Sequence, residues 1–145
     1  MAVRVDEFME DRNLETVDVV VGIILNEGNF LAEKRKPNEP IDPGITCLPG
    51  GHVGLGETHE HALMREMKEE LNIEVKKAKF IKRASWIASN GEKQNVHYYL
   101  ILDYEGTPER RTAECVSWKR NTRELDIEID RQAVKESRAM LRREK

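Results

Sequence analysis

The sequence predicts a single α/β domain, and three observations lead to this prediction. The chain has 145 residues, a length that one hydrophobic core can serve. Runs rich in β-branched residues, such as VDVVVGIIL, predict buried strands. Two other segments, one near the middle and one at the C-terminal end, repeat their apolar residues with the period of a helix. No repeat or linker divides the chain, so we expect one domain over residues 1–145.

The first predicted elements form a β-hairpin. Residues 17–25 are expected as a strand, residues 26–29 as a turn, and residues 30–34 as the returning strand. The next stretch, KPNEPIDPGITCLPGG, contains prolines and glycines that exclude long regular elements. We expect an ordered loop there, with one short extended piece at residues 45–48.

A helix is predicted over His59–Leu71. Thr58 can cap its N-terminus, and Asn72 can close its C-terminus in the left-handed conformation. The apolar arc of a helical wheel contains Leu63, Met64, Met67 and Leu71. We expect the glutamates of this helix on the arc that faces away from these residues.

The remaining elements are two strands, a short strand and a last helix. Residues 74–88 and 96–104 are expected as strands joined through an Asn-Gly turn, and residues 115–119 as a further strand. Residues 130–143 have the apolar spacing of an amphipathic helix.

Composition and charge exclude several classes of partner. With 24 Lys and Arg against 27 Asp and Glu, the net charge of -3 gives no field that would attract a nucleic acid polymer or an anionic membrane. Residues 17–25 are too short to cross a bilayer, and the acidic N-terminal stretch MAVRVDEFMEDRNLE does not resemble a signal peptide. Cys47 and Cys115 lack the spacing of a zinc site or disulfide framework. We therefore expect a cytoplasmic protein.

Three glutamates on the predicted helix form a candidate metal site. Glu66, Glu69 and Glu70 are spaced i, i+3, i+4, so their carboxylates emerge as one patch. Hard oxygen ligands of this kind suit Mg²⁺ or Mn²⁺. The alternative is a solvated helix face on which Arg65 and Lys68 are surface partners.

The wider spacing resembles the Nudix box over residues 51–73. The matching positions are Gly51, Glu57, the Arg65-Glu66 pair, the apolar Met67, the Glu69-Glu70 pair and the apolar Ile73. One position departs from the box, because Asn72 stands where the family has a glycine. This departure is mild, since asparagine can also adopt a left-handed cap. The LPGG that precedes the box is similar to the family as well.

The resemblance implies a Nudix hydrolase, with an α/β/α sandwich around a mixed β-sheet. Such enzymes cleave a nucleoside diphosphate linked to another group, X. In the family the glutamates of the second half of the box bind divalent metals, which corresponds here to Glu66, Glu69 and Glu70. The carbonyl of Gly50 is similar to a further ligand, and Glu57 and Arg65 resemble an orienting ion pair.

The general base stays open between residues of the box and a distant loop. Glu66 or Glu69 can accept the proton of an attacking water. Glu114 resembles the position of an extra loop glutamate in the family's metal site, or it is an exposed charge at a strand edge. Arg35 resembles a family position that meets the phosphates or the base, and His52 is the histidine expected to meet substrate.

Other residues admit structural roles. His59 and His61 fall on different faces of the helix, which argues against a shared zinc ion and favours surface or packing roles. Trp86, Tyr98 and Tyr99 are expected in the core, with stacking on a base as the alternative.

The substrate is chosen by residues outside the box. The chain lacks the features that mark several branches, and its short length resembles the MutT-type branch, which cleaves nucleoside triphosphates, oxidised ones included, to monophosphate and pyrophosphate. The alternatives are an ADP-ribose or dinucleoside polyphosphate pyrophosphatase, a nucleotide-sensing domain without catalysis, and an isopentenyl-diphosphate isomerase. Related folds often pair as homodimers, but nothing in this sequence marks an interface.

Overall fold

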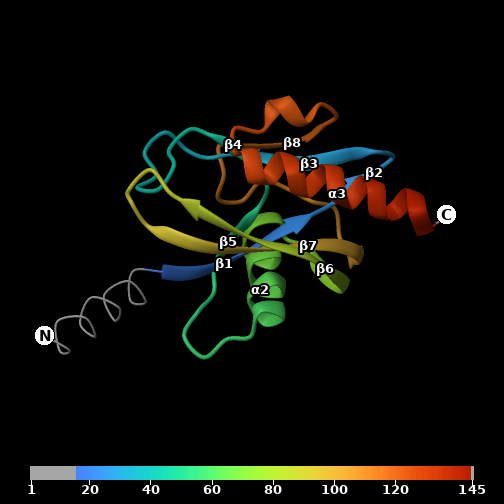
Figure 1. Cartoon of the computed structure of the whole chain (residues 1–145), viewed down its shortest axis with the longest axis horizontal. Helices are drawn as coiled ribbons and strands as arrows, with labels where there is room; N and C mark the ends of the chain where they lie inside the picture. The colour runs from blue at the N-terminus through green and yellow to red at the C-terminus, as the bar shows by residue number, and fades with distance from the viewer. Residues whose placement is uncertain (1–15, 145) are drawn as a thin grey trace, which may run out of the picture.

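The computed structural model describes residues 16–144, which form eight strands, two α-helices and one short 3₁₀-helix (Figure 1). The prediction about the N-terminal stretch concerns residues 1–15, which lie outside this range. The strands are β1 (Thr16–Ile23), β2 (Leu25–Asn26), β3 (Asn29–Lys34), β4 (Thr46–Cys47), β5 (Gly50–His52), β6 (Glu74–Ile87), β7 (Lys93–Glu105) and β8 (Cys115–Lys119). The helices are α2 (His59–Leu71), η1 (Thr122–Glu124) and α3 (Glu128–Glu144).

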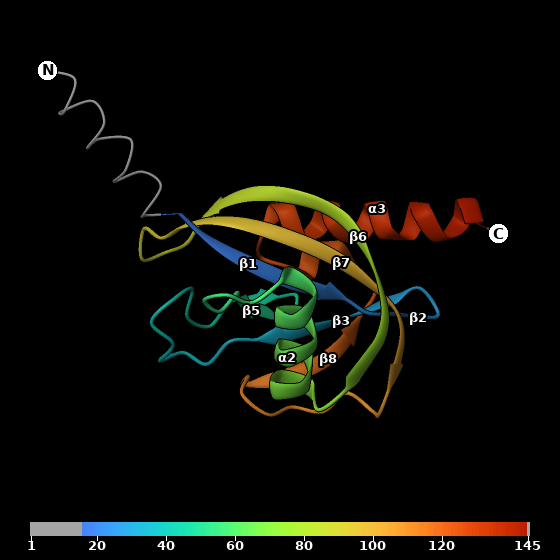
Figure 2. The same cartoon turned by 90° about the horizontal axis from the view of Figure 1, so that it is seen from below.

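The first sheet has the strand order β5-β1-β7-β6 and is mixed. β1 runs parallel to β7, whereas β5 pairs with β1 and β6 with β7 in antiparallel fashion. Helices α2 and α3 lie on opposite sides of this sheet (Figure 2). The predicted α/β/α sandwich around a mixed sheet is therefore confirmed.

Alternate residues of β1 contribute to two cores, because successive side chains of a strand point to opposite faces. The core on the α3 side includes Val19, Val21 and Ile23 of β1 together with Ala133 and Val134 of α3. The core on the α2 side includes Val20 together with Ala62, Leu63, Met67 and Leu71 of the helix. Because β1 is buried on both faces, its successive residues are apolar, which explains the apolar run in the sequence.

The predicted hairpin is only partly present. β2 and β3 form it, with Glu27 and Gly28 both at positive φ (54° and 84°), as a two-residue type I′ turn requires. However, the expected strand over residues 17–25 is divided. β1 belongs to the first sheet, and β2 belongs to a second sheet of order β2-β3-β4, in which β8 also pairs with β3. The sequence did not show this division because β1 pairs with β7, a strand distant along the chain.

The proline- and glycine-rich loop contains two short strands where one was expected. β4 lies in the predicted extended piece, but β5 follows it at Gly50–His52 and was not predicted. β5 pairs antiparallel to β1, with Gly51 opposite Val20 and His52 opposite Val19. The sequence LPGG therefore continues into the edge of the first sheet, beside α2.

Helix α2 has the predicted bounds and caps. The Thr58 hydroxyl accepts a hydrogen bond from the His61 amide, and Asn72 is left-handed with φ 57° and ψ 38°. One member of the expected apolar arc is placed differently, since Met64 is 44% exposed. Met64 lies at the border of the arc, and the helix turns Ala62 toward the sheet in its place.

Strand β6 lies at the end of the strand order and forms an edge of the first sheet. Its segment KKAKFIKR carries five basic residues among eight and no acidic one.

Among residues 16–144, no helix is long and apolar enough to cross a membrane.

Candidate active site

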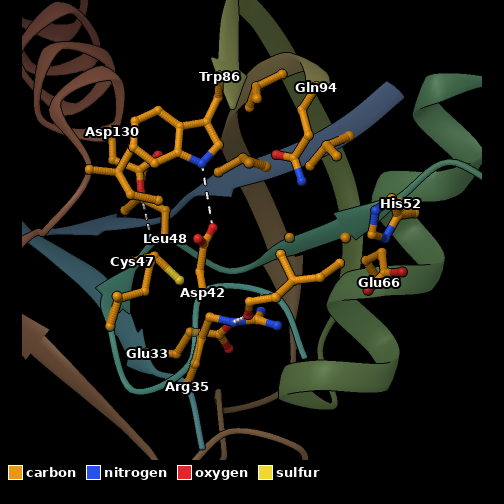
Figure 3. A pocket seen from close by; sticks show the side chains of 18 of the residues that line it. Glu33, Arg35, Asp42, Cys47, Leu48, His52, Glu66, Trp86, Gln94 and Asp130 are labelled. Carbon is orange, nitrogen blue, oxygen red and sulfur yellow. Dashed lines mark hydrogen bonds between the residues drawn. The ribbon is translucent and has the colours of Figure 1, made fainter. Parts of the chain in front are cut away.

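A pocket of about 450 Å³ opens between α2, the β5 edge and the loop after β3 (Figure 3). Its lining includes Glu66 and Glu70 of α2, Gly50, Gly51 and His52 of β5, and Glu33 of β3. Trp86, Gln94 and Asp130 line other parts of it. The volume lies within the range of about 300–1,000 Å³ that is usual for small-molecule sites.

Two of the predicted glutamates face into this pocket and not away from the protein. The Glu66 side chain is 12% exposed and lines the pocket with Glu70, whereas Glu69 is 56% exposed. The expectation that all three lie on the arc opposite the core is therefore wrong. Because α2 rests on the first sheet beside β5, the flank of the helix next to its apolar face is covered as well.

Glu33 completes the carboxylate cluster, and sequence reasoning missed it. It lies on β3, is 4% exposed, and comes close enough to Glu70 for each carboxyl group to affect the pKa of the other. Burial raises the pKa of both groups above the ordinary glutamate range. A signal was present, because Glu33 interrupts the apolar strand NFLAEK, where β3 is buried on both faces.

Arg65 holds the outer carboxylates in place. Its Nε and Nη2 atoms donate to the two oxygens of Glu57 at 2.7 and 2.9 Å, and Nη1 donates to Glu66 at 2.8 Å and Glu69 at 3.2 Å. Nη2 also donates to the His52 carbonyl at 3.0 Å. The Arg65 hydrogen bonds lower the pKa of Glu57 to about 2. Burial raises the pKa of Glu66, and the Arg65 guanidinium opposes that shift.

The two glycines of LPGG allow β5 to lie between β1 and α2. A Cβ on Gly50 would lie 2.2 Å from the Val20 carbonyl oxygen. A Cβ on Gly51 would lie 2.3 Å from the carboxyl carbon of Glu66. The strand register explains the second contact, because Gly51 lies opposite Val20, whose side chain faces α2. No side chain can stand at either position without displacing a neighbour.

Arg35 and His52, the two predicted substrate contacts, both line the pocket. Arg35 donates from Nε to the Ile41 carbonyl at 2.9 Å and from Nη2 to Glu39 at 3.1 Å. The ring of His52 lies 2.8 Å from Glu92, measured from Nε2 to Oε1. Figure 3 shows both residues on the same pocket as Glu33 and Glu66. Their positions are therefore compatible with the predicted contacts to substrate.

Glu114 is not brought to the pocket. It is exposed, and its amide donates to the Lys34 carbonyl at 2.8 Å at the start of β8. The pocket lining does not include Glu114. Its place in the metal site therefore stays a prediction.

Another part of the pocket combines an aromatic ring with polar groups that sequence reasoning did not select. The Trp86 indole Nε1 donates to Asp42 at 3.4 Å, and Gln94 lies beside them on β7 (Figure 3). Trp86 is half-buried, whereas Tyr98 and Tyr99 lie in the core as expected. Asp42 and Gln94 come from a loop and a strand with no local motif, so only the fold could identify them.

A buried carboxyl group connects the first turn of α3 to the loop before β5. Asp130 accepts hydrogen bonds from the Tyr98 hydroxyl at 2.5 Å and from the Leu48 amide at 3.1 Å. Burial raises the pKa of Asp130 to about 6, although both hydrogen bonds oppose the shift. The contact fixes LPGG relative to α3.

The carboxylate cluster fits a divalent cation. Glu33 Oε2 and Glu70 Oε2 are both buried and have no hydrogen-bond partner in the structure. Unpaired buried carboxylate oxygens are costly, and a hard cation is a partner that would offset this cost. Glu66 and Gly50 line the same pocket and carry further oxygen atoms, and Glu69 lies on the exposed side, hydrogen-bonded to Arg65.

Known proteins resemble this chain in both sequence and structure. A family model described as the NUDIX domain matches residues 16–142. A CTP pyrophosphohydrolase of Escherichia coli (strain K12) is 28% identical over 105 residues, which are 72% of this chain and 76% of that protein. An 8-oxo-dGTP diphosphatase of the same organism is 25% identical over 105 residues, covering 72% and 81%.

A solved structure shows the same fold. The crystal structure of a MutT NUDIX hydrolase from Burkholderia pseudomallei has a TM-score of 0.73 and 28% identity, and the match covers 83% of this chain and 97% of that one. The fold is thus that of a Nudix hydrolase. The chain belongs to the NUDIX family.

Proposed function

We propose that this Nudix hydrolase cleaves nucleoside triphosphates, oxidised ones such as 8-oxo-dGTP included, to the monophosphate and pyrophosphate. The observation that carries the proposal is the pocket, in which the carboxylates of α2 and the Trp86 and Gln94 side chains line one space. A nucleotide needs both kinds of surface, one for its phosphates and one for its base. The relatives named above as a CTP pyrophosphohydrolase and an 8-oxo-dGTP diphosphatase support this choice.

We infer that Glu66, Glu69 and Glu70, with the Gly50 carbonyl, hold Mg²⁺ or Mn²⁺. When bound, the cation would neutralise phosphate oxygens and lower the pKa of the attacking water. Glu33 belongs to the same cluster and adds a buried carboxyl group at its inner end, where a bound cation would favour the ionised form. The oxygen-rich donor set favours these hard cations over zinc.

The residues of the chain have separate tasks in this reaction. Glu66 or Glu69 accepts the proton of the water as its oxygen forms a bond to phosphorus and the anhydride oxygen leaves with pyrophosphate. Arg65, fixed by Glu57, keeps both carboxylates in position. Arg35 and His52 contact the phosphates from the pocket wall. Trp86 stacks on the base, and Gln94 donates or accepts hydrogen bonds at its edge.

The test is product analysis with and without Mg²⁺ on dNTPs, 8-oxo-dGTP, CTP, ADP-ribose and dinucleoside polyphosphates. We expect metal-dependent release of pyrophosphate and a monophosphate from a triphosphate. The Glu69→Gln/Glu70→Gln double variant is expected to lose this turnover and keep its fold by circular dichroism. Glu60→Gln, an exposed glutamate in the first turn of the same helix, is the matched control and should stay active.

Other results would revise the proposal in specific ways. Cleavage of ADP-ribose or a dinucleotide in place of triphosphates would keep the site and overturn the substrate. Wild-type turnover in the double variant would overturn the site. No turnover on any substrate would favour a nucleotide-sensing domain.

A cytoplasmic location is part of the proposal. Cys47 is a buried free thiol and Cys115 an exposed one, and free thiols suit a reducing compartment.

A further inference from the structure

Three metal-binding side chains from three elements meet outside the pocket. Asp18 lies on β1, His97 on β7, and His59 is the first residue of α2. One ligand atom from each residue lies within 4.8 Å of the other two. None of the three lines the pocket described above, and none belongs to its carboxylate cluster. They form a separate group, here called the Asp-His-His cluster.

The sheet register explains why Asp18 and His97 meet. In the parallel pair β1–β7, Asp18 lies opposite Asn95 and Val20 opposite His97. Asp18, Val20 and His97 therefore point to the same face, the face that α2 covers. His97 Nε2 lies 3.0 Å from Asp18 Oδ1 across the two strands.

The start of α2 brings the third side chain to the same place. The ring centroids of His59 and His97 are 4.0 Å apart, with the ring planes inclined by 43°. His97 is buried, Asp18 is exposed, and His59 is half-buried, so the cluster opens to solvent on one side. His59 makes this ring contact but no hydrogen bond from its ring to any residue of the described segment 16–144. Its nitrogens are free to act as ligands.

Two imidazoles and one carboxylate are the ligand types that zinc and similar transition metals prefer, whereas Mg²⁺ prefers oxygen alone. With bonds of about 2.0–2.1 Å, the ligand atoms of a tetrahedral zinc ion lie about 3.3 Å apart. The 3.0 Å contact between Asp18 and His97 is already near this separation. The ligand atom of His59 lies within 4.8 Å of the other two, so only a small shift separates it from this spacing.

We propose that Asp18, His59 and His97 bind one transition-metal ion of the zinc class, with water as the fourth ligand. The ion joins β1, β7 and the N-terminus of α2. Glu66 follows His59 by seven residues on this helix, about 10 Å along its axis. Metal at the Asp-His-His cluster therefore fixes the helix that carries the catalytic carboxylates. It also stabilises the folded chain, because the ion binds the folded state and not the unfolded state.

The test is metal binding to the full chain after treatment with EDTA, in excess Mg²⁺ so that the carboxylate cluster is occupied. Titration calorimetry with Zn²⁺ is expected to give one ion per chain. Co²⁺ is expected to give the visible absorption bands of a tetrahedral site with nitrogen ligands. Zn²⁺ should also raise the melting temperature by about 5 °C at saturating concentration.

Variants distinguish this cluster from surface histidines and from the carboxylates. His59→Ala, at the start of the helix, and the isosteric Asp18→Asn should each weaken Zn²⁺ binding at least about tenfold and remove the rise in melting temperature. His61→Ala, an exposed histidine on the same turn, should bind zinc as the wild type does. The Glu69→Gln/Glu70→Gln variant should do the same.

Two results would overturn the proposal. One is the absence of saturable Zn²⁺ binding, or equal binding by the wild type and His59→Ala. The other is binding that is lost in Glu69→Gln/Glu70→Gln and kept in His59→Ala, which would place zinc on the carboxylates. Neither depends on hydrolysis, so the proposed triphosphatase activity can fail while this proposal stands.

Discussion

Arg65 is the residue on which the order of the site depends most. One guanidinium group bridges Glu57, Glu66 and Glu69 and reaches the His52 carbonyl. A lysine keeps the charge but has no planar fork for these simultaneous hydrogen bonds. We predict that Arg65→Lys lowers kcat/KM about 10–100-fold and weakens the apparent affinity for Mg²⁺.

The measurement is a Mg²⁺ titration of initial rates for both proteins. Arg83→Lys, an exposed arginine of β6, is the matched control and should behave as the wild type. An Arg65→Lys enzyme with unchanged Mg²⁺ dependence would show that the arginine does not position the carboxylates.

We expect Glu70 to lower the stability of the folded protein at neutral and higher pH. Its folded pKa is raised by burial and by the neighbouring Glu33, so the folded state retains the proton to a higher pH than the unfolded state does. The sign follows: stability from this group falls as pH rises above the ordinary glutamate pKa, so at pH 8 the carboxyl group is a net cost. We predict that Glu70→Gln melts at a higher temperature than the wild type at pH 8 in EDTA, while hydrolysing nothing.

Melting curves with and without Mg²⁺ test this expectation. Mg²⁺ should stabilise the wild type and not the variant, because it binds the ionised carboxylates. Glu69→Gln, at a glutamate that is 56% exposed, should leave the melting temperature in EDTA almost unchanged. A Glu70→Gln protein that melts below the wild type would contradict the cost assigned to Glu70.

At the scale of elements, β5 is held between two neighbours that respond differently to an added methyl group. In Gly50→Ala the new Cβ meets the Val20 carbonyl, which is backbone of the central strand β1. In Gly51→Ala it meets the Glu66 carboxyl group, the end of a flexible side chain. We predict that Gly50→Ala lowers the melting temperature strongly, whereas Gly51→Ala keeps most stability and loses at least about tenfold in kcat/KM by displacing Glu66.

The two variants serve as each other's controls in melting and rate measurements. Equal losses of stability would mean that Glu66 cannot move aside. Full activity in Gly51→Ala would mean that the position of Glu66 is not critical for turnover.

The elements that sequence alone predicted are those with local signals. Thr58 and Asn72 mark the ends of α2, and the type I′ turn at Glu27-Gly28 marks the β2–β3 hairpin. The glutamate spacing selected the helix of the candidate metal site for the same reason. The division of residues 17–25 between two sheets carried no local signal, because it depends on pairing with β7.

The same distinction holds within the site. Box residues could be selected from spacing alone, whereas Glu33, Asp42 and Asp130 reach the pocket only through strand pairing and helix packing. The sequence also carried no signal that His59 would lie beside His97. His97 is 38 positions away in the sequence, so comparison with His61 could not identify it.

At the scale of the whole molecule, the Asp130 carboxyl group links three parts of the chain, namely α3, β7 and the loop before β5. Its pKa is about 6 in the folded protein against an ordinary value of 3.8. The folded state thus binds the proton more tightly, and stability from this group falls as pH rises from about 4 to 6. The total change is about 3 kcal/mol at most.

We predict that Asp130→Asn removes this part of the pH dependence. An asparagine can accept from the Leu48 amide and donate to the Tyr98 hydroxyl, so the packing is kept. The measurement is the free energy of unfolding by urea at pH 4.5 and 7.5. The variant should gain relative to the wild type on going to the higher pH, and parallel profiles would refute the assignment.

The basic edge strand β6 bears on how copies of this protein meet one another. An exposed sheet edge is a template on which a second chain can add its own edge strand, and such growth leads to aggregates. In an antiparallel encounter of two β6 strands, the segment KKAKFIKR would bring cation against cation in most registers, including the one in which the two segments overlap fully. The charge of this strand therefore acts as a barrier to filament growth. Two copies that associate would therefore be expected to use another face.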